Sequence, residues 1–156
     1  MGVSIQILVD ADACPVKEEI YKVALRHDVA VKIVSNSAFR VLAHPLVERV
    51  VVGSGFDEAD DWIAERANPH SIVITADILL ADRALKADAT VLSPTGKPFT
   101  ANSIGTAIAT RAIMADLRAG GDVIGGPAPF AKTDRSRFLA ALDEALVRMK
   151  RHTGLC

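Results

Sequence analysis

The chain has 156 residues, of which 50% are hydrophobic and only 4% are aromatic, and its net charge at neutral pH is −1. A domain of this length buries roughly 70% of its unfolded surface, so its fold needs no disulfide or metal staple. The near-zero charge argues against strong non-specific binding to nucleic acid. Cys14 and Cys156 make no disulfide framework. With no apolar run of membrane-spanning length and no leader pattern, we expect a cytoplasmic protein that binds no membrane.

The first two thirds of the chain alternate short β-branched runs with amphipathic segments. This alternation predicts an α/β fold with a central, mostly parallel sheet and helices on both faces. The expected strands cover residues 3–9, 29–34, 49–52, 71–74 and 90–92. The expected helices are one opened by Pro15, one over residues 37–47 with a break near Pro45, and those over residues 57–67 and 78–86.

The pattern changes after the last expected strand. A turn-rich stretch leads to an alanine-rich helix over residues 102–119, which Gly120 ends. Thr133 or Asp134 can cap a final helix. Five apolar residues share one face of that helix: Phe138, Leu142, Ala145, Leu146 and Met149. We expect a single domain over residues 1–151, with the C-terminal helices packed on the sheet and residues 152–156 as a frayed tail.

Acidic residues follow two of the expected strands. Asp10 and Asp12 come after the first strand, and Asp77 comes after the fourth. Ligands bind at the carboxyl ends of strands in open α/β sheets. Carboxylates gathered there repel each other unless a cation lies between them, and oxygen-rich clusters suit Mg²⁺ or Mn²⁺. The pattern predicts a metal site that handles phosphate, although turn and helix-cap roles also favour Asp at these positions.

A third acidic group opens the helix expected over residues 57–67. Asp57, Asp60 and Asp61 are spaced i, i+3 and i+4, so they lie on roughly one helix face. The positive end of a helix favours acids, but like charges at this spacing repel each other. We interpret these three residues as further metal ligands, with a purely favourable acidic first turn as the alternative.

Two motifs resemble parts of known nucleases. Glu58-Ala-Asp-Asp-Trp-Ile-Ala is similar to the acidic helix motif of the 5′-nuclease domain in bacterial DNA polymerases. Ile74-Thr-Ala-Asp is similar to the strand-end Thr-x-Asp motif of the related PIN domains. This resemblance, over residues 3–93, implies a three-layer PIN-like fold with Mg²⁺ or Mn²⁺ held by Asp10, by Asp60 or Asp61, and by Asp77. The chain departs from the polymerase nucleases at Leu79, where they usually place a second acid.

A longer pattern resembles the YaiI/YqxD-like family of bacterial proteins. It is carried by Val9-Asp-Ala-Asp-Ala-Cys-Pro-Val, Gly55-Phe-Asp-Glu-Ala-Asp-Asp, Arg118 with Gly120, and Gly126-Pro-Ala-Pro-Phe with Asp134, Arg135 and Phe138. The pattern spans nearly the whole chain. It implies a PIN-like fold and brings no settled activity with it.

Polar and basic residues at two other places are candidates for contact with a substrate. One group follows the second expected strand, and its alternative role is helix capping. The other opens the last helix, where arginines and a helix N-terminus can hold phosphate; its alternative role is a solvated helix start. The candidates are Ser35, Asn36, Ser37, Arg40, Lys132, Arg135 and Arg137.

The leading prediction is a metal-dependent nuclease acting on RNA or DNA, with Asp10, Asp61 and Asp77 as catalytic residues. One alternative is a nucleic-acid-binding module without catalysis, which Leu79 and the low net charge favour. Another is a phosphatase, because Val9-Asp-Ala-Asp resembles the opening motif of the haloacid dehalogenase superfamily, with Asp10 as nucleophile. Against the phosphatase, no lysine lies in residues 33–85, where that superfamily is expected to have one. The oligomeric state stays open.

Overall fold

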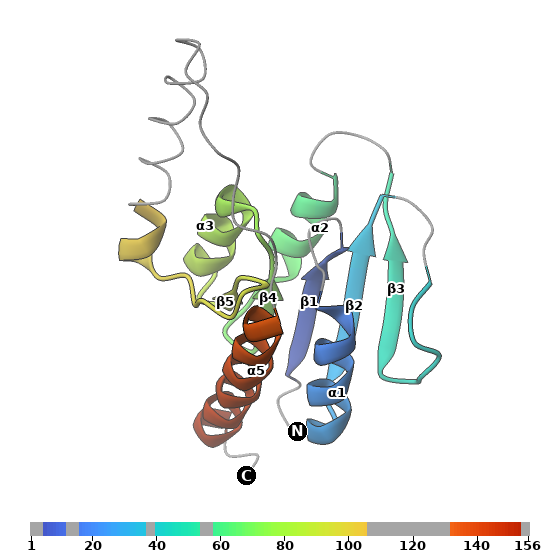
Figure 1. The fold of residues 1–156 in the computed structure, drawn as a ribbon. Helices are drawn as coiled ribbons and strands as arrows, with labels where there is room; N and C mark the ends of the chain where they lie inside the picture. Colours follow the sequence, from blue (N-terminus) through green and yellow to red (C-terminus); the bar gives the residue numbers. More distant parts are fainter. Residues whose placement is uncertain (1–4, 12–15, 37–39, 54–57, 106–131, 154–156) are drawn as a thin grey trace, which may run out of the picture.

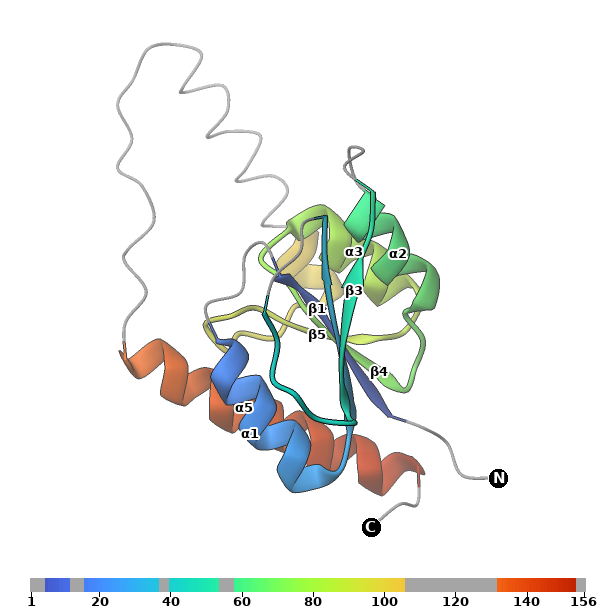
Figure 2. The same ribbon diagram turned by 90° about the vertical axis from the view of Figure 1, so that its right-hand side faces the viewer.

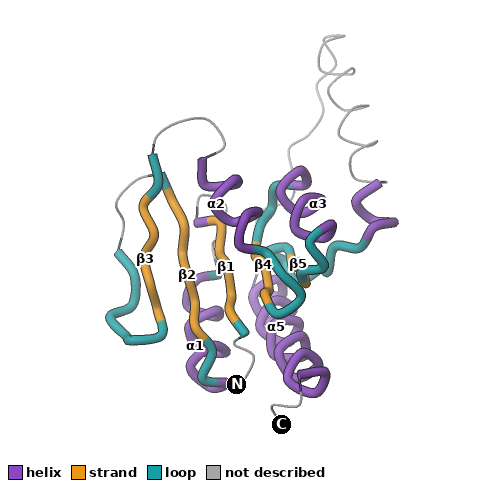
Figure 3. The backbone as a smooth tube through the Cα atoms, turned by 180° about the vertical axis from the view of Figure 1, so that it is seen from behind, coloured by secondary structure: helices purple, strands orange, loops and turns teal. Residues whose placement is uncertain are grey.

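A five-stranded parallel sheet forms the centre of the molecule (Figures 1 and 3). The computed structural model describes residues 5–11, 16–36, 40–53, 58–105 and 132–153. The strands are β1 (Gln6–Asp10), β2 (Ala30–Ser35), β3 (Val47–Val51), β4 (Ser71–Ile74) and β5 (Thr90–Leu92). They lie in the order β3-β2-β1-β4-β5, and every neighbouring pair is parallel.

The helices cover both faces of this sheet, so the domain has three layers (Figure 2). They are α1 (Lys17–His27), α2 (Glu58–Arg66), α3 (Ile78–Lys86) and α5 (Lys132–Thr153). α1 and α5 lie on one face, and α2 and α3 lie on the other (Figure 2). Connections between parallel strands are right-handed. The chain adds β2 and β3 on one side of β1 and then β4 and β5 on the other side, so the helices that follow β3 lie on the opposite face of the sheet. Among the described residues, no helix is long and apolar enough to cross a membrane.

Two apolar clusters fill the spaces between the layers. Successive residues of a strand point to opposite faces, and on β1 this sends Ile7 and Val9 towards α1 and α5 and Leu8 towards α2 and α3. Phe138 and Leu142 of α5 are fully buried against the first face. The predicted α/β class and the predicted apolar face of the last helix are therefore confirmed.

The helix expected over residues 37–47 is wrong in its described part. Residues 40–46 form no helix, and Val47 already belongs to β3. The Leu46 carbonyl accepts a hydrogen bond from the Val31 N–H at 2.7 Å, so the chain is already paired with β2 there. The Val47 N–H donates to the carbonyl of His44 across a turn that contains Pro45. Tertiary pairing at the sheet edge has overridden the local helical pattern.

The remaining predictions of elements differ from the structure mainly at their ends. The strands expected over residues 71–74 and 90–92 and the helix over residues 78–86 have the expected bounds. Residues 101–105 are helical, and the rest of the alanine-rich helix expected over residues 102–119 lies outside the described residues. α5 continues to Thr153, into the segment expected to be a frayed tail.

Candidate functional site

The carboxyl ends of β1 and β4 mark the place where the sheet changes direction. From β1 the chain adds β2 and β3 on one side, and β4 and β5 then follow on the other side. β1 and β4 are directly paired, from Gln6 opposite Ser71 to Val9 opposite Ile74. In open α/β sheets, such a switch point opens the crevice in which ligands bind. The residues that follow these two strands therefore occupy the position where the fold favours a site.

A buried hydrogen bond joins the ends of the two strands. Asp10 is the last residue of β1 and is 7% exposed, while Thr75 directly follows β4 and is 1% exposed. The Thr75 hydroxyl donates to Oδ2 of Asp10 at 3.0 Å. The Thr75 N–H donates to the carbonyl of Leu92, which also ties this position to β5. A buried carboxylate is costly without donors, so the hydroxyl of Thr75 helps Asp10 to remain at this edge.

The same hydroxyl also holds Asp77. The Asp77 N–H donates to the Thr75 hydroxyl oxygen at 3.0 Å. Oδ1 of Asp77 accepts from the N–H groups of Leu79 at 2.8 Å and Leu80 at 3.3 Å, so Asp77 is the N-cap of α3. The capping role weighed for this acid is thus present in the structure. The arrangement also brings the two strand-end acids to one hydroxyl group, Asp10 through its carboxylate and Asp77 through its backbone.

The acids of α2 have a different environment. Oδ1 of Asp61 lies 2.8 Å from Nη1 of Arg83 on α3, and both side chains are about half-exposed, at 54% and 45%. Within the described residues, no hydrogen bond or ion pair joins Asp61 to Asp10 or Asp77. Asp60 is half-buried on the same helix, and Asp57 lies outside the described residues. Asp61 ties α2 to α3, and its catalytic role stays a prediction.

The donor set at the switch point suits a hard cation. Among the residues that the structure describes, no three His, Cys, Asp or Glu side chains form a metal-binding group. Asp12, a further predicted ligand, lies outside them. Mg²⁺ is commonly held by only one or two carboxylates together with water and substrate phosphate. Asp10 and Asp77 each bring one carboxylate to this edge of the sheet, and Oδ1 of Asp77 is the oxygen that caps α3.

The polar candidates after β2 lie at the same edge of the sheet. Ser35 ends β2 and is 3% exposed, and the β1–β2 register pairs Asp10 with the preceding residue, Val34. Asn36 and Arg40 are exposed, and Ser37 lies outside the described residues. Ser35 is therefore a direct neighbour of the Asp10 strand end, whereas Asn36 and Arg40 belong to the surface.

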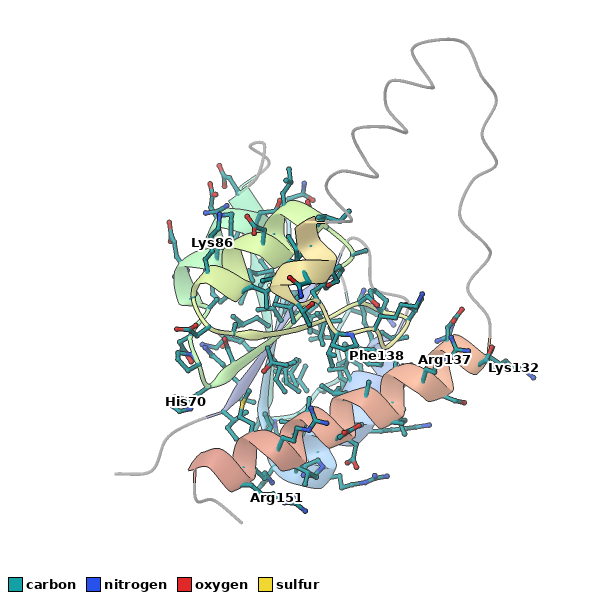
Figure 4. The ribbon with its side chains drawn as sticks, turned by 90° about the vertical axis from the view of Figure 1, so that its left-hand side faces the viewer. His70, Lys86, Lys132, Arg137, Phe138 and Arg151 are labelled. Atoms are coloured by element: carbon teal, nitrogen blue, oxygen red, sulfur yellow. The ribbon has the colours of Figure 1, made fainter. Side chains whose placement is uncertain are left out.

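The basic candidates lie on the first turns of α5. Lys132, Arg135 and Arg137 are exposed, and Nη1 of Arg135 lies 3.5 Å from Oε1 of Glu19 in the first turn of α1. Figure 4 shows Lys132 and Arg137 together at the end of α5 that is opposite Arg151. Since α1 begins after the carboxyl end of β1, this ion pair places the start of α5 on the carboxyl side of the sheet.

Gly96, in the loop after β5, also holds the start of α5 in place. Gly96 follows β5 and has a φ of +86°, in the left-handed region. A Cβ at this residue would lie 2.7 Å from the backbone carbon and oxygen of Arg137. The loop after β5 therefore packs closely on the backbone of α5, which only glycine permits.

Sequence reasoning missed two residues of this region. Thr75 belongs to the Ile74-Thr-Ala-Asp motif, but the sequence analysis gives it no role. The signal that points to it is a hydroxyl two residues before a strand-end acid. Arg83, the partner of Asp61, has no comparable signal, because it meets Asp61 only when α2 and α3 pack side by side.

Comparison with known proteins matches most of the chain, including the site, to one protein family. Residues 8–148 match the family described as "Uncharacterized BCR, YaiI/YqxD family". The chain belongs to the YaiI/YqxD family. This confirms the predicted family membership, and the matched span contains Asp10, Thr75 and Asp77.

Relatives of similar length support the assignment. A UPF0178 protein of Sphingopyxis alaskensis is 75% identical over 93% of this chain and 95% of its own length. UPF0178 proteins of Bradyrhizobium diazoefficiens and Nitrobacter winogradskyi are 58% and 57% identical, over 94% and 95% of this chain and 87% and 94% of their own lengths. No solved structure matches the chain.

Proposed function

We propose that this YaiI/YqxD protein is a Mg²⁺- or Mn²⁺-dependent phosphodiesterase that cleaves RNA or DNA at the carboxyl ends of β1 and β4. The observation that carries the proposal is the hydroxyl of Thr75, which contacts the carboxylate of Asp10 and the backbone of Asp77 at the switch point of the sheet. Two acids from separate strands thus lie where the fold favours a ligand.

The described residues would have distinct roles. Asp10 and Asp77 would each offer a carboxylate oxygen to the ion, while Thr75 keeps Asp10 in one orientation and the N-terminus of α3 does the same for Asp77. When bound, the metal ion lowers the pKa of a water molecule and neutralises charge on the scissile phosphate. Asp12, Asp57, Asp60 and Asp61 are proposed as further ligands or as acids around the ion.

A substrate backbone would run towards the start of α5. Lys132, Arg135 and Arg137 are exposed there, on the same side of the sheet as Asp10. Arginine can hold phosphate with paired N–H donors, and such contacts position a nucleic-acid backbone without reading its sequence. Ser35, Asn36, Ser37 and Arg40 are proposed to contact the substrate from the β2 side.

The test is a comparison of hydrolysis by the wild type and three Asp→Asn variants in Mg²⁺ or Mn²⁺. Asp10→Asn and Asp77→Asn remove the charge of a proposed ligand, and Asn caps a helix as well as Asp does. Asp88→Asn is the matched control, because Asp88 is exposed, lies on the amino side of β5 and has a φ of 66°, which Asn adopts readily. The substrates are single-stranded RNA and DNA, duplex and flap DNA, and a small phosphomonoester.

The proposal expects cleavage of at least one polymer, lost on chelation and in the Asp10 and Asp77 variants but kept in Asp88→Asn. Polymer cleavage that survives both site variants would overturn the assignment of the site. Hydrolysis of the monoester alone, lost in Asp10→Asn, would instead favour the phosphatase with Asp10 as nucleophile.

One observation favours a second candidate, a nucleic-acid-binding module without turnover. Leu79 is 54% exposed on the first turn of α3, beside Asp77, at the position where the polymerase nucleases usually have an acid. In a binding module, substitution of Lys132, Arg135 and Arg137 would weaken binding, and affinity would fall steeply with salt. The Asp→Asn variants would then leave binding unchanged.

A further inference from the structure

A pocket of about 550 Å³ lies beside α5 on the β5 side of the sheet. Thr90 and Leu92 of β5 and Met149 of α5 are among its lining residues, and His70 closes it from the turn before β4. None of the acids of the proposed phosphodiesterase site lines it. Figure 4 looks onto this edge of the molecule, with His70 towards the Arg151 end of α5 and Lys132 far from it. The volume is within the roughly 300–1,000 Å³ of pockets that bind small molecules.

Small residues on α5 make this space. Residues i and i+4 of a helix lie on the same face, and here Ala141 and Ala145 both line the pocket. Leu92 belongs to the core cluster on the α5 side of the sheet, and Thr90, two residues before it, shares that side. A larger side chain at Ala145 would occupy the volume. The pocket therefore exists because these two positions carry alanine, and a larger side chain there is a direct way to test it.

The lining has an apolar body and a polar margin with no net charge. Glu144 and Arg148 form an i,i+4 ion pair with 2.6 Å between Oε1 and Nη2, and their side chains are 64% and 71% exposed. Their charges cancel at the margin of the pocket. Burying an unpaired charge is expensive, so the lining favours an uncharged guest.

His70 supplies a second, independent observation. Its Nδ1 is buried and has no hydrogen-bond partner among the described residues. Buried polar atoms nearly always have a partner, so an orphaned ring nitrogen in a residue that lines the pocket calls for an explanation. A ligand with an O–H or N–H group would provide the missing partner once the imidazole turns about its Cβ–Cγ bond.

We propose that this pocket binds an uncharged small molecule with an aliphatic body and one hydroxyl or amide group, which bonds to His70. The ligand site is separate from the phosphodiesterase site and does not depend on that function. The aliphatic body would lie against Leu92, Ala145 and Met149, and the polar group would face His70.

The experiment is a methyl NMR titration of the intact chain with three probes that share a cyclohexyl ring: cyclohexanol, cyclohexanecarboxylate and cyclohexylammonium. The chain has only three methionines, so the Met149 methyl is readily assigned. For seven heavy atoms we expect a Kd of roughly 1 mM for cyclohexanol, at the affinity per atom usual for small ligands. The two charged probes should bind at least about fivefold more weakly, because the pocket gives their charge no free partner.

Three variants decide between this pocket and surface adsorption. Ala145→Leu should abolish the Met149 shift, while Ala140→Leu, the same change at an exposed position of α5, should leave it intact. His70→Phe keeps a ring but removes both nitrogens, so cyclohexanol should bind about fivefold more weakly. The proposal is overturned if the Met149 shift does not saturate, if it persists in Ala145→Leu, if a charged probe binds best, or if His70→Phe binds cyclohexanol unchanged.

Discussion

Replacing Thr75 with valine tests the link between the two strand ends. Valine keeps the branched shape of threonine but has a methyl group in place of the hydroxyl, so both hydrogen bonds are lost. Thr75 is 1% exposed, which leaves little room for water to take the place of the hydroxyl. The Asp10 carboxylate loses a donor at 3.0 Å, and the Asp77 N–H loses an acceptor at 3.0 Å.

The expected cost follows from these two bonds. A hydrogen bond to a charged group contributes roughly 1.5–3 kcal/mol to stability, and one between neutral groups contributes about 1 kcal/mol. The extra buried methyl group of valine returns about 0.8 kcal/mol. The free energy of unfolding should therefore fall by roughly 2–3 kcal/mol, a large part of the 5–15 kcal/mol typical of a domain.

Urea unfolding followed by circular dichroism measures this loss as a lower midpoint with an unchanged m-value. Thr75→Ser is the control, because it keeps the hydroxyl and loses only a methyl group, at a cost of about 1 kcal/mol. The same valine change in Asp10→Asn protein should cost less, since the charged acceptor is already gone. Equal stability of the serine and valine variants, or an equal loss in both backgrounds, would refute the role given to Thr75.

Four further predictions can each be checked by thermal or urea unfolding. Asp77→Ala should lose about 1 kcal/mol as the cap of α3 is removed, whereas Asp77→Asn should change stability by less than about 0.5 kcal/mol. Gly96→Ala should lower the free energy of unfolding by roughly 1–3 kcal/mol, because Gly96 has a positive φ and lies close to the backbone of α5. Asp143→Ala removes the 2.6 Å contact with His27 that joins α5 to α1 and should cost about 1 kcal/mol. Millimolar Mn²⁺ should raise the Tm of the wild type but not of Asp10→Asn; equal shifts would place the ion elsewhere.

Local sequence was sufficient to predict the strand-end acids but not the hydroxyl of Thr75 that joins them. A β-branched run that ends in acid predicts where a strand stops, and Asp10 and Asp77 lie as expected, at the end of β1 and just after β4. Both residues can bond to the hydroxyl of Thr75 only because β1 pairs with β4 rather than with another strand. That pairing is a non-local contact, and no spacing in the sequence encodes it. The same holds for Thr75, whose hydroxyl becomes a link only when β4 lies beside β1.

Two other predictions depended on local spacing alone. The helix over residues 37–47 is wrong in its described part, and the metal role of the acids on α2 is untested. Helical spacing placed Asp57, Asp60 and Asp61 on one face, but the rotation of α2 against its neighbours decides what that face meets, and for Asp61 it meets Arg83. Around Pro45, hydrophobic spacing suggested a helix, yet the chain pairs with β2 instead. At residues 40–46 a tertiary partner, absent from any local window, determined the result, while the metal-binding role of Asp57, Asp60 and Asp61 stays a prediction.

The two proposed sites share one short strand. β4 has His70 of the pocket directly before it and Thr75 of the switch point directly after it, and all four of its residues are buried. A strand of this length spans about 13 Å, which is beyond the distance at which mutational effects usually couple. Ala145→Leu and Asp10→Asn should therefore be additive in stability to within about 0.5 kcal/mol. A larger deviation would show that the pocket and the switch point are energetically coupled, and cyclohexanol would then change the rate of phosphodiester cleavage.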